Sequence, residues 1–225
     1  MINFLKKIFR NQVVFNSLQI NTPISSVFGM DRGTPIDRYY IEKFLNSQKH
    51  FVKGTVLEVA EPYYTKKYGE KVSRIEILNA VPSDLATIVA DLSKPDSLPT
   101  EKVDCFICTQ TYNFIYDVKK AIEGSHRILK KDGVLLVTVA GLTQISRYDM
   151  DRWGDYWRFT DKSIGRMISE VFGVENVQVF IYGNVLAGIA FLQGIAVEDL
   201  PEPQLLDKED NNYQITIGIV AKKSG

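Results

Sequence analysis

Three carboxylates lie at or near the ends of short apolar runs. Glu58 lies near the end of VLEVAE, Glu76 lies within RIEILNA, and Asp91 directly follows TIVA. Runs rich in Val, Ile and Leu are typical of strands that are covered on both faces of a parallel sheet. Ligands of open α/β sheets bind beyond the carboxyl ends of the strands, where the strand order reverses. We therefore expect an acidic rim for a ligand at this edge.

The loop after the first of these runs lacks the glycines of a nucleotide-binding fingerprint. Ala60 and Glu61 stand where glycines are expected. Glycine there lets the main chain approach a pyrophosphate at a helix N-terminus, as in Gly-x-Gly-x-x-Gly. The sequence therefore argues against a dinucleotide and favours a ligand without phosphates. We expect Tyr63, Tyr64 and the following lysines to close this loop.

A second polar group follows the apolar run 103–108. Thr109, Gln110 and Thr111 come directly after it. Two interpretations of Gln110 stay open, namely orientation of a substrate hydroxyl and a hydrogen bond to the main chain of the loop.

The segment 146–160, SRYDMDRWGDYWRFT, combines aromatic and charged residues after the strand-like run 134–139. Aromatic rings stack on the apolar face of a sugar, while Asp and Arg bind its hydroxyls, so Tyr148, Trp153 and Arg158 are candidate substrate-binding residues. Asp149 and Asp151 are candidate general bases, each provided that its pKa and geometry suit the reaction. We expect Trp157 and Phe159 to pack in the core instead.

The histidines and cysteines do not indicate a catalytic or metal site. His126 falls near the end of a predicted helix, and His50 precedes the first strand. Two histidines cannot form an ordinary histidine-rich metal site. Cys105 and Cys108 lie in one apolar strand, three residues apart and therefore on opposite faces, so they are expected to be buried thiols in a reducing compartment.

The order of predicted elements indicates an α/β sheet with helices on both faces. Apolar runs predict seven strands, with the last two resembling an antiparallel pair. Helical spacing and end signals predict four helices. The predicted strands are 55–60, 74–78, 87–90, 103–108, 134–139, 177–182 and 213–220, and the helices are 35–48, 117–129, 162–172 and 185–196.

Composition excludes several classes of protein. The 225 residues are 45% hydrophobic, and 27 basic residues balance 27 acidic ones. A net charge of zero implies no long-range field for nucleic acid. The opening MINFLKKIFRNQVVF has neither the h-region nor the cleavage site of a signal peptide, and no run is long enough to span a membrane. We expect a cytoplasmic protein whose N-terminal segment packs on the domain, on a partner or on a membrane surface.

Residues 54–141 resemble the S-adenosylmethionine-dependent methyltransferases of the broad type 11 group. VLEVAE is similar to the first strand of that group, and ATIVADLSKPDSLP to its third. HRILKKDG before an apolar strand resembles its Arg-x-Leu-Lys-Pro-Gly-Gly signature, with Lys131 and Asp132 replacing Pro and Gly. The resemblance implies a Rossmann-like class I methyltransferase fold, in which a seven-stranded, mostly parallel sheet has an antiparallel last strand.

A narrower resemblance covers nearly the whole chain. DRGTPIDRYYIEKFL, the loop 64–69 and the segment 146–160 resemble a bacterial branch that is associated with surface-glycan biosynthesis. It implies a domain at 51–225 behind an N-terminal extension or lid at 1–50. Arg32 in this extension either binds an acidic group of cofactor or sugar or pairs with Asp31 or Asp37.

The resemblance also implies residue roles for S-adenosylmethionine and its product S-adenosylhomocysteine. Glu76 would accept from the ribose hydroxyls, with Asn79 sharing or replacing it, and Asp91 and the Leu92 N–H would bind adenine. Glu58 would reach the amino-acid end. Main-chain and nearby contacts would come from Ala60 and Thr109.

The predicted activity is methyl transfer to a hydroxyl, or less readily an amine, of a sugar or glycan precursor, without a metal. A possible homodimer through the N-terminal helix is left open. The main alternative is a catalytically silent cofactor-binding module that partners glycosyltransferases. A nucleotide-dependent oxidoreductase on the same fold lacks the Gly-x-Gly-x-x-Gly motif it would need.

Overall fold

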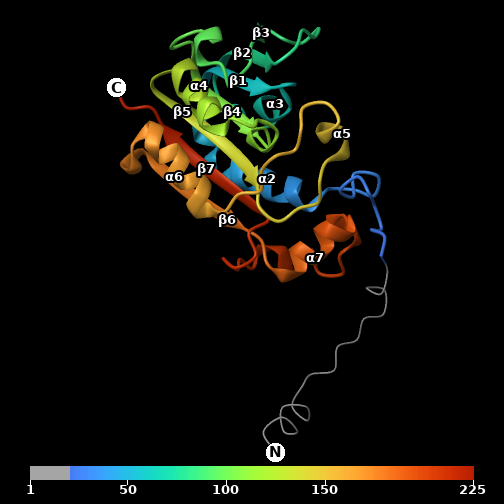
Figure 1. The fold of residues 1–225 in the computed structure, drawn as a ribbon. Coiled ribbons are helices and arrows are strands. Elements are labelled where there is room, and N and C mark those ends of the chain that lie inside the picture. Colours follow the sequence, from blue (N-terminus) through green and yellow to red (C-terminus); the bar gives the residue numbers. More distant parts are fainter. Residues whose placement is uncertain (1–20) are drawn as a thin grey trace, which may run out of the picture.

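The computed structural model describes residues 21–225, which form one seven-stranded sheet with helices on both faces. The strand order is β3-β2-β1-β4-β5-β7-β6, and β7 runs antiparallel to both of its neighbours (Figure 1). The strands are β1 Gly54–Val59, β2 Val72–Asn79, β3 Ile88–Val89, β4 Val103–Thr109, β5 Leu129–Ala140, β6 Val177–Tyr182 and β7 Thr216–Lys222. The predicted fold class is confirmed.

The strand order reverses between β1 and β4. From β1 the chain builds outward to β2 and β3, and then returns to add β4 and β5 on the other side. Both β1–β2 and β1–β4 pairings are parallel, so these strands end at one edge. This arrangement places the expected ligand crevice between the ends of β1 and β4.

The described residues contain six α-helices, of which four were predicted. They are α2 Ile36–Gln48, α3 Tyr63–Tyr68, α4 Val118–Ile128, α5 Arg147–Met150, α6 Asp161–Phe172 and α7 Val185–Gln193. N-cap side chains fix the starts of four of them, because Asp117, Ser146, Thr160 and Asn184 accept main-chain N–H bonds in α4, α5, α6 and α7. Such caps stabilise a helix end by about 1 kcal/mol.

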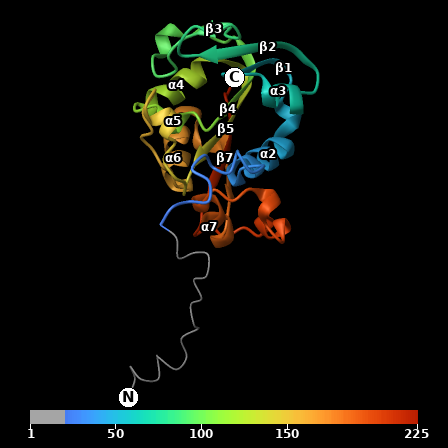
Figure 2. The same cartoon turned by 90° about the vertical axis from the view of Figure 1, so that its right-hand side faces the viewer.

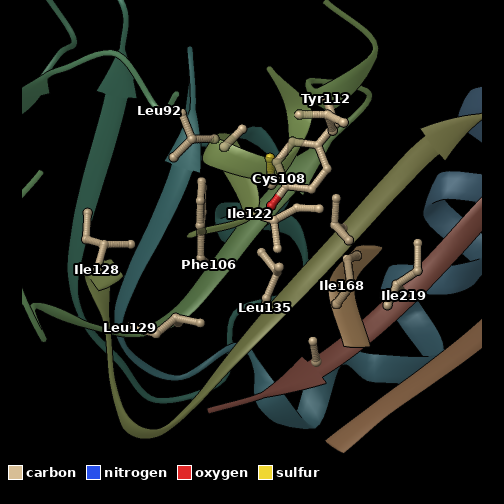
Figure 3. Close-up of a cluster of buried hydrophobic side chains, with 14 of the residues drawn as sticks. Leu92, Phe106, Cys108, Tyr112, Ile122, Ile128, Leu129, Leu135, Ile168 and Ile219 are labelled. Atoms are coloured by element: carbon tan, nitrogen blue, oxygen red, sulfur yellow. The ribbon is translucent and has the colours of Figure 1, made fainter. Parts of the chain in front are cut away.

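The helices cover the two faces of the sheet in pairs. Figure 2 shows α4 and α6 on one side of the sheet and α2 and α3 on the other. One core contains Ile122 of α4, Ile168 of α6 and strand residues such as Phe106 (Figure 3). The second core contains Tyr40 and Phe44 of α2 and Phe191 of α7. Because α2 belongs to this core, residues 36–48 are an integral layer of the fold.

Several local predictions differ from the structure. The segment 64–69 was expected to be a loop, but Tyr63–Tyr68 is a helix because Glu58 caps its first turn. β5 begins at Leu129, directly after α4, whereas the predicted strand began only at residue 134. The predicted helix 185–196 ends at Gln193, because Gly194 adopts the left-handed conformation that closes α7.

The histidines and cysteines lie away from the cavities described below. His126 packs edge-on against Phe172 with ring centroids 4.9 Å apart, and burial lowers its pKa. Cys105 and Cys108 are buried free thiols. Within residues 21–225 no group of three or more His, Cys, Asp and Glu side chains is placed to hold a metal ion.

The same residues include no helix with the length and apolar character needed to cross a bilayer. The predicted N-terminal helix and the dimer contact assigned to it lie outside the described residues. The domain division at residue 50 stays a prediction.

Candidate functional site

A cavity of about 270 Å³ lies at the carboxyl ends of β1 and β4. Its walls come from the β1 loop, the end of β4, the start of α2 and the segment that carries α5, which overhangs this edge in Figure 1. Among the described residues, four carboxylates and one guanidinium line it, namely Asp37, Glu58, Glu61, Asp149 and Arg38. The cavity therefore occupies the crevice that the reversal of strand order predicts.

A smaller cavity of about 50 Å³ adjoins the larger one. Both are lined by Phe28, Asp37, Gln110 and Ser146. The walls of the smaller cavity also include Ala140 at the end of β5. Its volume holds a few water-sized groups, so it suits the reacting end of a substrate while the larger cavity suits a bulkier ligand.

Glu58 fixes the loop and helix that follow β1. Its Oε1 accepts from the Tyr64 N–H at 2.9 Å and its Oε2 from the Thr65 N–H at 2.7 Å. Burial raises the pKa of Glu58, and these hydrogen bonds oppose that rise. The partners of Glu58 are therefore main-chain N–H groups, and not the lysines that follow at positions 66 and 67. Glu58 lines the larger cavity while it holds the loop.

Ala60 takes the conformation that a glycine would take at this position. Its φ is +68°, a left-handed value that costs a non-glycine residue roughly 1–2 kcal/mol. The Ala60 N–H donates to the Leu78 carbonyl at 3.1 Å, which anchors the turn to the end of β2. The absence of glycine therefore leaves the turn geometry intact, and Ala60 lines the cavity.

Thr109 and Gln110 form the β4 side of the larger cavity. Gln110 has a φ of +49°, and its N–H donates to the Thr138 carbonyl of β5 at 2.8 Å. Its side-chain Oε1 accepts from Asn113 at 3.4 Å, while the side chain lines both cavities. The only hydrogen bond of the Gln110 side chain among the described residues is to the Asn113 side chain, so the interpretation of a bond to the loop main chain is wrong. Orientation of a substrate hydroxyl by Gln110 stays a prediction.

Glu76 lies inside β2 rather than at its end. It pairs in register with Leu57, is fully buried, and forms ion pairs with Arg74 and Lys102. Burial acts to raise its pKa, but the nearby Thr87 hydroxyl and the charges of Lys102 and Arg74 leave that pKa lowered. The residue that ends β2 is Asn79. The geometry therefore favours Asn79 over Glu76 as the polar group at this edge.

Asp91 and Leu92 follow β3, and neither lines the two cavities. Asp91 Oδ1 accepts from the Ser93 N–H and hydroxyl at 2.9 and 2.7 Å. Burial acts to raise the pKa of Asp91, but these bonds and Lys94 outweigh it, so the carboxyl is ionised more readily than usual. The Leu92 side chain packs in the core of Figure 3, which leaves only its main chain for a ligand.

The segment after β5 divides into a pinned part and an exposed part. Arg158 donates through both Nη atoms to the buried carboxylate of Asp155, at 2.5 and 2.8 Å, and to the Gln144 carbonyl at 2.7 Å. Asp155, with a side chain only 1% exposed, also accepts from the Ser146 N–H. Arg158 therefore closes the loop and lines the smaller cavity, with its guanidinium committed to Asp155.

The exposed part contains the remaining candidates. Asp149 lines the larger cavity and accepts from the Ser146 hydroxyl at 2.6 Å. Asp151 is exposed, pairs with Arg147 at 3.6 Å and lines neither cavity. Tyr148 and Trp153 are 65% and 46% exposed, outside both cavities. As expected, Phe159 is buried and Trp157 packs against the same core.

Arg32 is tied to a distant part of the chain. Its Nε and Nη2 donate to the two carboxylate oxygens of Asp199 at 2.8 and 2.9 Å. Neither Asp31 nor Asp37 is its partner, so that predicted pairing is wrong.

Two residues of the site were not singled out from the sequence as candidates for chemistry. Arg38 lines the larger cavity and also a neighbouring groove of about 370 Å³, and Asp37 lines both cavities. They lie next to each other in DRGTPIDRYYIE, where Asp37 was considered only as a partner of Arg32. Both residues lie in the first turn of α2, directly after buried Pro35, and this position places them at the site. Pro35 before a helical pattern is the sequence signal that could have located them.

Comparisons with known proteins agree with this geometry. The family described as "Methyltransferase domain" matches residues 55–137. An S-adenosylmethionine-dependent methyltransferase from Mesorhizobium loti is similar in structure, with a TM-score of 0.52, 14% identity and coverage of 86% of this chain and 100% of that chain. A SAM-dependent methyltransferase from Archaeoglobus fulgidus has a TM-score of 0.52 and 11% identity, over 82% and 98% of the two chains. No curated protein sequence matches this chain.

The family match and the structural likeness bear on different properties. At such low identity the similar structures show a shared fold only. The match over residues 55–137, which contain β1 to β4 and most of β5, assigns methyl transfer with S-adenosylmethionine as the cofactor.

Proposed function

We propose that this methyltransferase acts on a hydroxyl group of a sugar or glycan precursor. The observation that carries the proposal is the buried hydroxyl of Thr143 in the wall of the smaller cavity, around which eight of the thirteen residues are polar. They are Asp37, Gln110, Asn113, Thr143, Gln144, Ser146, Asp155 and Arg158. The Thr143 hydroxyl is buried and has no hydrogen-bond partner among the described residues. A buried polar group of this kind is stabilised by a polar ligand, and a polyol supplies one.

The larger cavity fits the methionine end of the cofactor. Arg38 is the cation that its described walls offer to a carboxylate, while the carboxylates of the β1 and β5 walls, Glu58, Glu61 and Asp149, suit an ammonium and a sulfonium. Asn79 and the Leu92 main chain, at neighbouring strand ends, would hold the adenosine part, with Asp91 beside them. The bound cofactor would supply a methyl group already activated for displacement.

Catalysis by this chain then consists mainly of positioning. Glu58 holds the β1 loop, Gln110 lies where the two cavities meet, and Ser146 is oriented by Asp149. Such residues raise the rate by holding donor and acceptor in a near-attack arrangement. A base is also needed where the acceptor is an unactivated hydroxyl.

Exposed aromatic residues in the segments that follow β4 and β5 support a carbohydrate acceptor. Tyr116, Tyr148, Trp153 and Tyr156 are 72%, 65%, 46% and 50% exposed. Tyr116 and Tyr156 pack edge to face with centroids 5.5 Å apart. Aromatic rings in such positions offer stacking area at a small cost in conformational entropy.

The test is a transfer assay with S-adenosylmethionine that carries a labelled methyl group. Sugars and glycan fractions serve as acceptors, beside matched amino sugars and sugar acids. We expect label in a methyl ether that survives mild alkali. Label in an alkali-labile ester or in an amine would contradict the hydroxyl assignment. Binding of S-adenosylhomocysteine without transfer to any acceptor would identify the silent module instead.

A further inference from the structure

We propose that Asp37 is the general base that takes the proton from the acceptor hydroxyl. The inference rests on the proposed function and adds a catalytic residue to it. It is carried by position, because Asp37 is the carboxylate that faces both cavities and has an oxygen free of hydrogen bonds from the described residues. A base for this reaction must reach the point at which donor and acceptor meet.

The start of α2 holds Asp37 firmly in this place. Asp37 is the second residue of the helix, between buried Ile36 and the exposed Arg38. Its Oδ1 accepts from the Arg38 N–H at 2.7 Å. No described side chain forms an ion pair with Asp37, and its Oδ2 has no hydrogen bond within residues 21–225. One carboxylate oxygen is therefore oriented while the other is available to a proton.

The other acidic candidates are less suitably placed. Asp149 and Glu61 line the larger cavity but not the smaller one. Asp149 Oδ2 accepts from Ser146 at 2.6 Å, while its Oδ1 and the Glu61 carboxylate have no hydrogen bond within residues 21–225, so position separates these two from Asp37. Asp151 faces neither cavity. Asp155 is committed to Arg158 through both oxygens. Glu58 uses both oxygens to hold the β1 loop.

The electrostatic surroundings also suit a base. Burial raises the pKa of Asp37 to about 6, against opposing contributions from the Arg38 N–H and the Arg38 charge. Glu58, Glu61 and Asp149 face the same larger cavity, while Asp155 and Arg158 face the smaller one as a neutral pair. A base whose pKa lies just below the working pH is ionised and still accepts a proton efficiently.

The chemical step is balanced without a further reagent. The acceptor oxygen forms a bond to the methyl carbon while the carbon–sulfur bond breaks and its electron pair stays on sulfur. The hydroxyl proton moves to Asp37 Oδ2, and the carboxyl later returns it to solvent through the open cavity. Asp37 thus contacts the acceptor hydroxyl and takes its proton, whereas Ser146 and Asp149 only help to position the acceptor.

The test compares Asp37→Asn with Asp149→Asn in the full chain, using the hydroxyl acceptor found in the transfer assay. Asparagine is isosteric and keeps an acceptor for the Arg38 N–H, so the Asp37→Asn protein should fold and bind S-adenosylhomocysteine within about threefold of wild type. We expect its kcat to fall about 10²- to 10⁴-fold. The wild-type rate should decline below about pH 6, and this decline should be absent from the residual activity of Asp37→Asn.

Asp37→Glu is the second variant and should recover part of the lost rate. A kcat for Asp37→Asn within threefold of wild type would overturn the assignment, as would an acid decline near pH 6 that persists without Asp37. A larger loss in Asp149→Asn than in Asp37→Asn would assign the base to Asp149. Failure of wild type to methylate any hydroxyl would instead overturn the proposed function, and the base assignment with it.

Discussion

The two walls of the site are held in different ways. The β1 wall, residues 58–68, turns tightly into α3 and is fixed by the Glu58 carboxylate on two main-chain N–H groups. The β5 wall, residues 141–159, is long and is fixed at its far end by the Arg158–Asp155 pair. Between Ser146 and Asp155 the β5 wall presents exposed Tyr148, Asp151 and Trp153 to solvent.

We expect this difference to separate cofactor binding from acceptor binding. In a short wall that is fixed by hydrogen bonds to main-chain groups, the main-chain geometry does not depend on the exposed side chains. Such a wall suits the cofactor, which is the same in every reaction cycle. A long wall pinned at one end can present different side chains over a constant frame. We therefore expect changes in the β1 wall to affect the cofactor and changes in the exposed β5 wall to affect the acceptor.

The largest effect is expected from Arg158→Ala. Its loss leaves the buried Asp155 carboxylate without a cation, which lowers the free energy of unfolding by about 3–5 kcal/mol. Arg147→Ala is the matched control, because Arg147 forms an exposed pair with Asp151 worth about 0–1 kcal/mol. Urea denaturation measures both. Equal losses in the two variants would show that the Arg158 pair does not pin the wall.

Glu58→Gln tests the β1 wall. Glutamine offers one acceptor oxygen to two main-chain N–H groups, so one donor at the start of α3 is left unpaired at a cost of about 1–3 kcal/mol. We expect calorimetry to show S-adenosylhomocysteine affinity lowered at least tenfold, with the KM for the acceptor little changed. Glu61→Gln, at an exposed position on the same wall, should preserve stability. An acceptor defect without a cofactor defect would reverse the assignment of the walls.

Asp37→Asn should also change the dependence of stability on pH. Because the folded-state pKa is raised to about 6, the carboxyl favours the folded state below its ordinary pKa near 3.8, and this contribution is lost as pH rises through 6. At pH 7.5 the variant should therefore be more stable than wild type by about 1–2 kcal/mol, a value reduced by the opening of the cavity to solvent. Thermal melts at pH 4 and 7.5 measure it, and a constant difference would contradict the raised pKa.

The smallest effect on stability is expected from Trp153→Ala. The exposed ring leaves the core untouched, so the free energy of unfolding should change by less than about 0.5 kcal/mol. Loss of a stacking surface should raise the KM for a sugar acceptor about 3- to 30-fold. Val174→Ala, which removes an exposed apolar side chain elsewhere, is the control. An unchanged KM would remove Trp153 from the acceptor surface.

The sequence predicted the sheet well because strand runs such as VDCFICT are apolar on both faces. Short runs of this kind are typical of strands that are buried on both sides, and few other elements fit them. It missed α3, since the cap that starts this helix is Glu58, five residues earlier and on another element. The resemblance gave Glu76 the ribose role although it lies inside the predicted strand 74–78, and in the structure β2 continues to Asn79, so Asn79 is the residue at the strand end. Partners such as Arg32–Asp199 and Arg158–Asp155 depend on tertiary contacts that local spacing does not encode.

Asp37 shows the same limit within the site. In sequence it is one of several charges in DRGTPIDRYYIE, and a surface ion pair with a neighbouring arginine was the simpler expectation. Only the packing of α2 against the sheet brings this carboxylate to the meeting point of the two cavities.

Calorimetric titration of the full chain with S-adenosylhomocysteine, beside NAD at matched concentration, tests the central claim most directly. The cavity between β1 and β4 predicts saturable binding of one S-adenosylhomocysteine per chain, weakened by Glu58→Gln and left intact by Asp37→Asn. NAD should give no binding heat. Saturable binding of NAD alone by the folded protein would contradict the account.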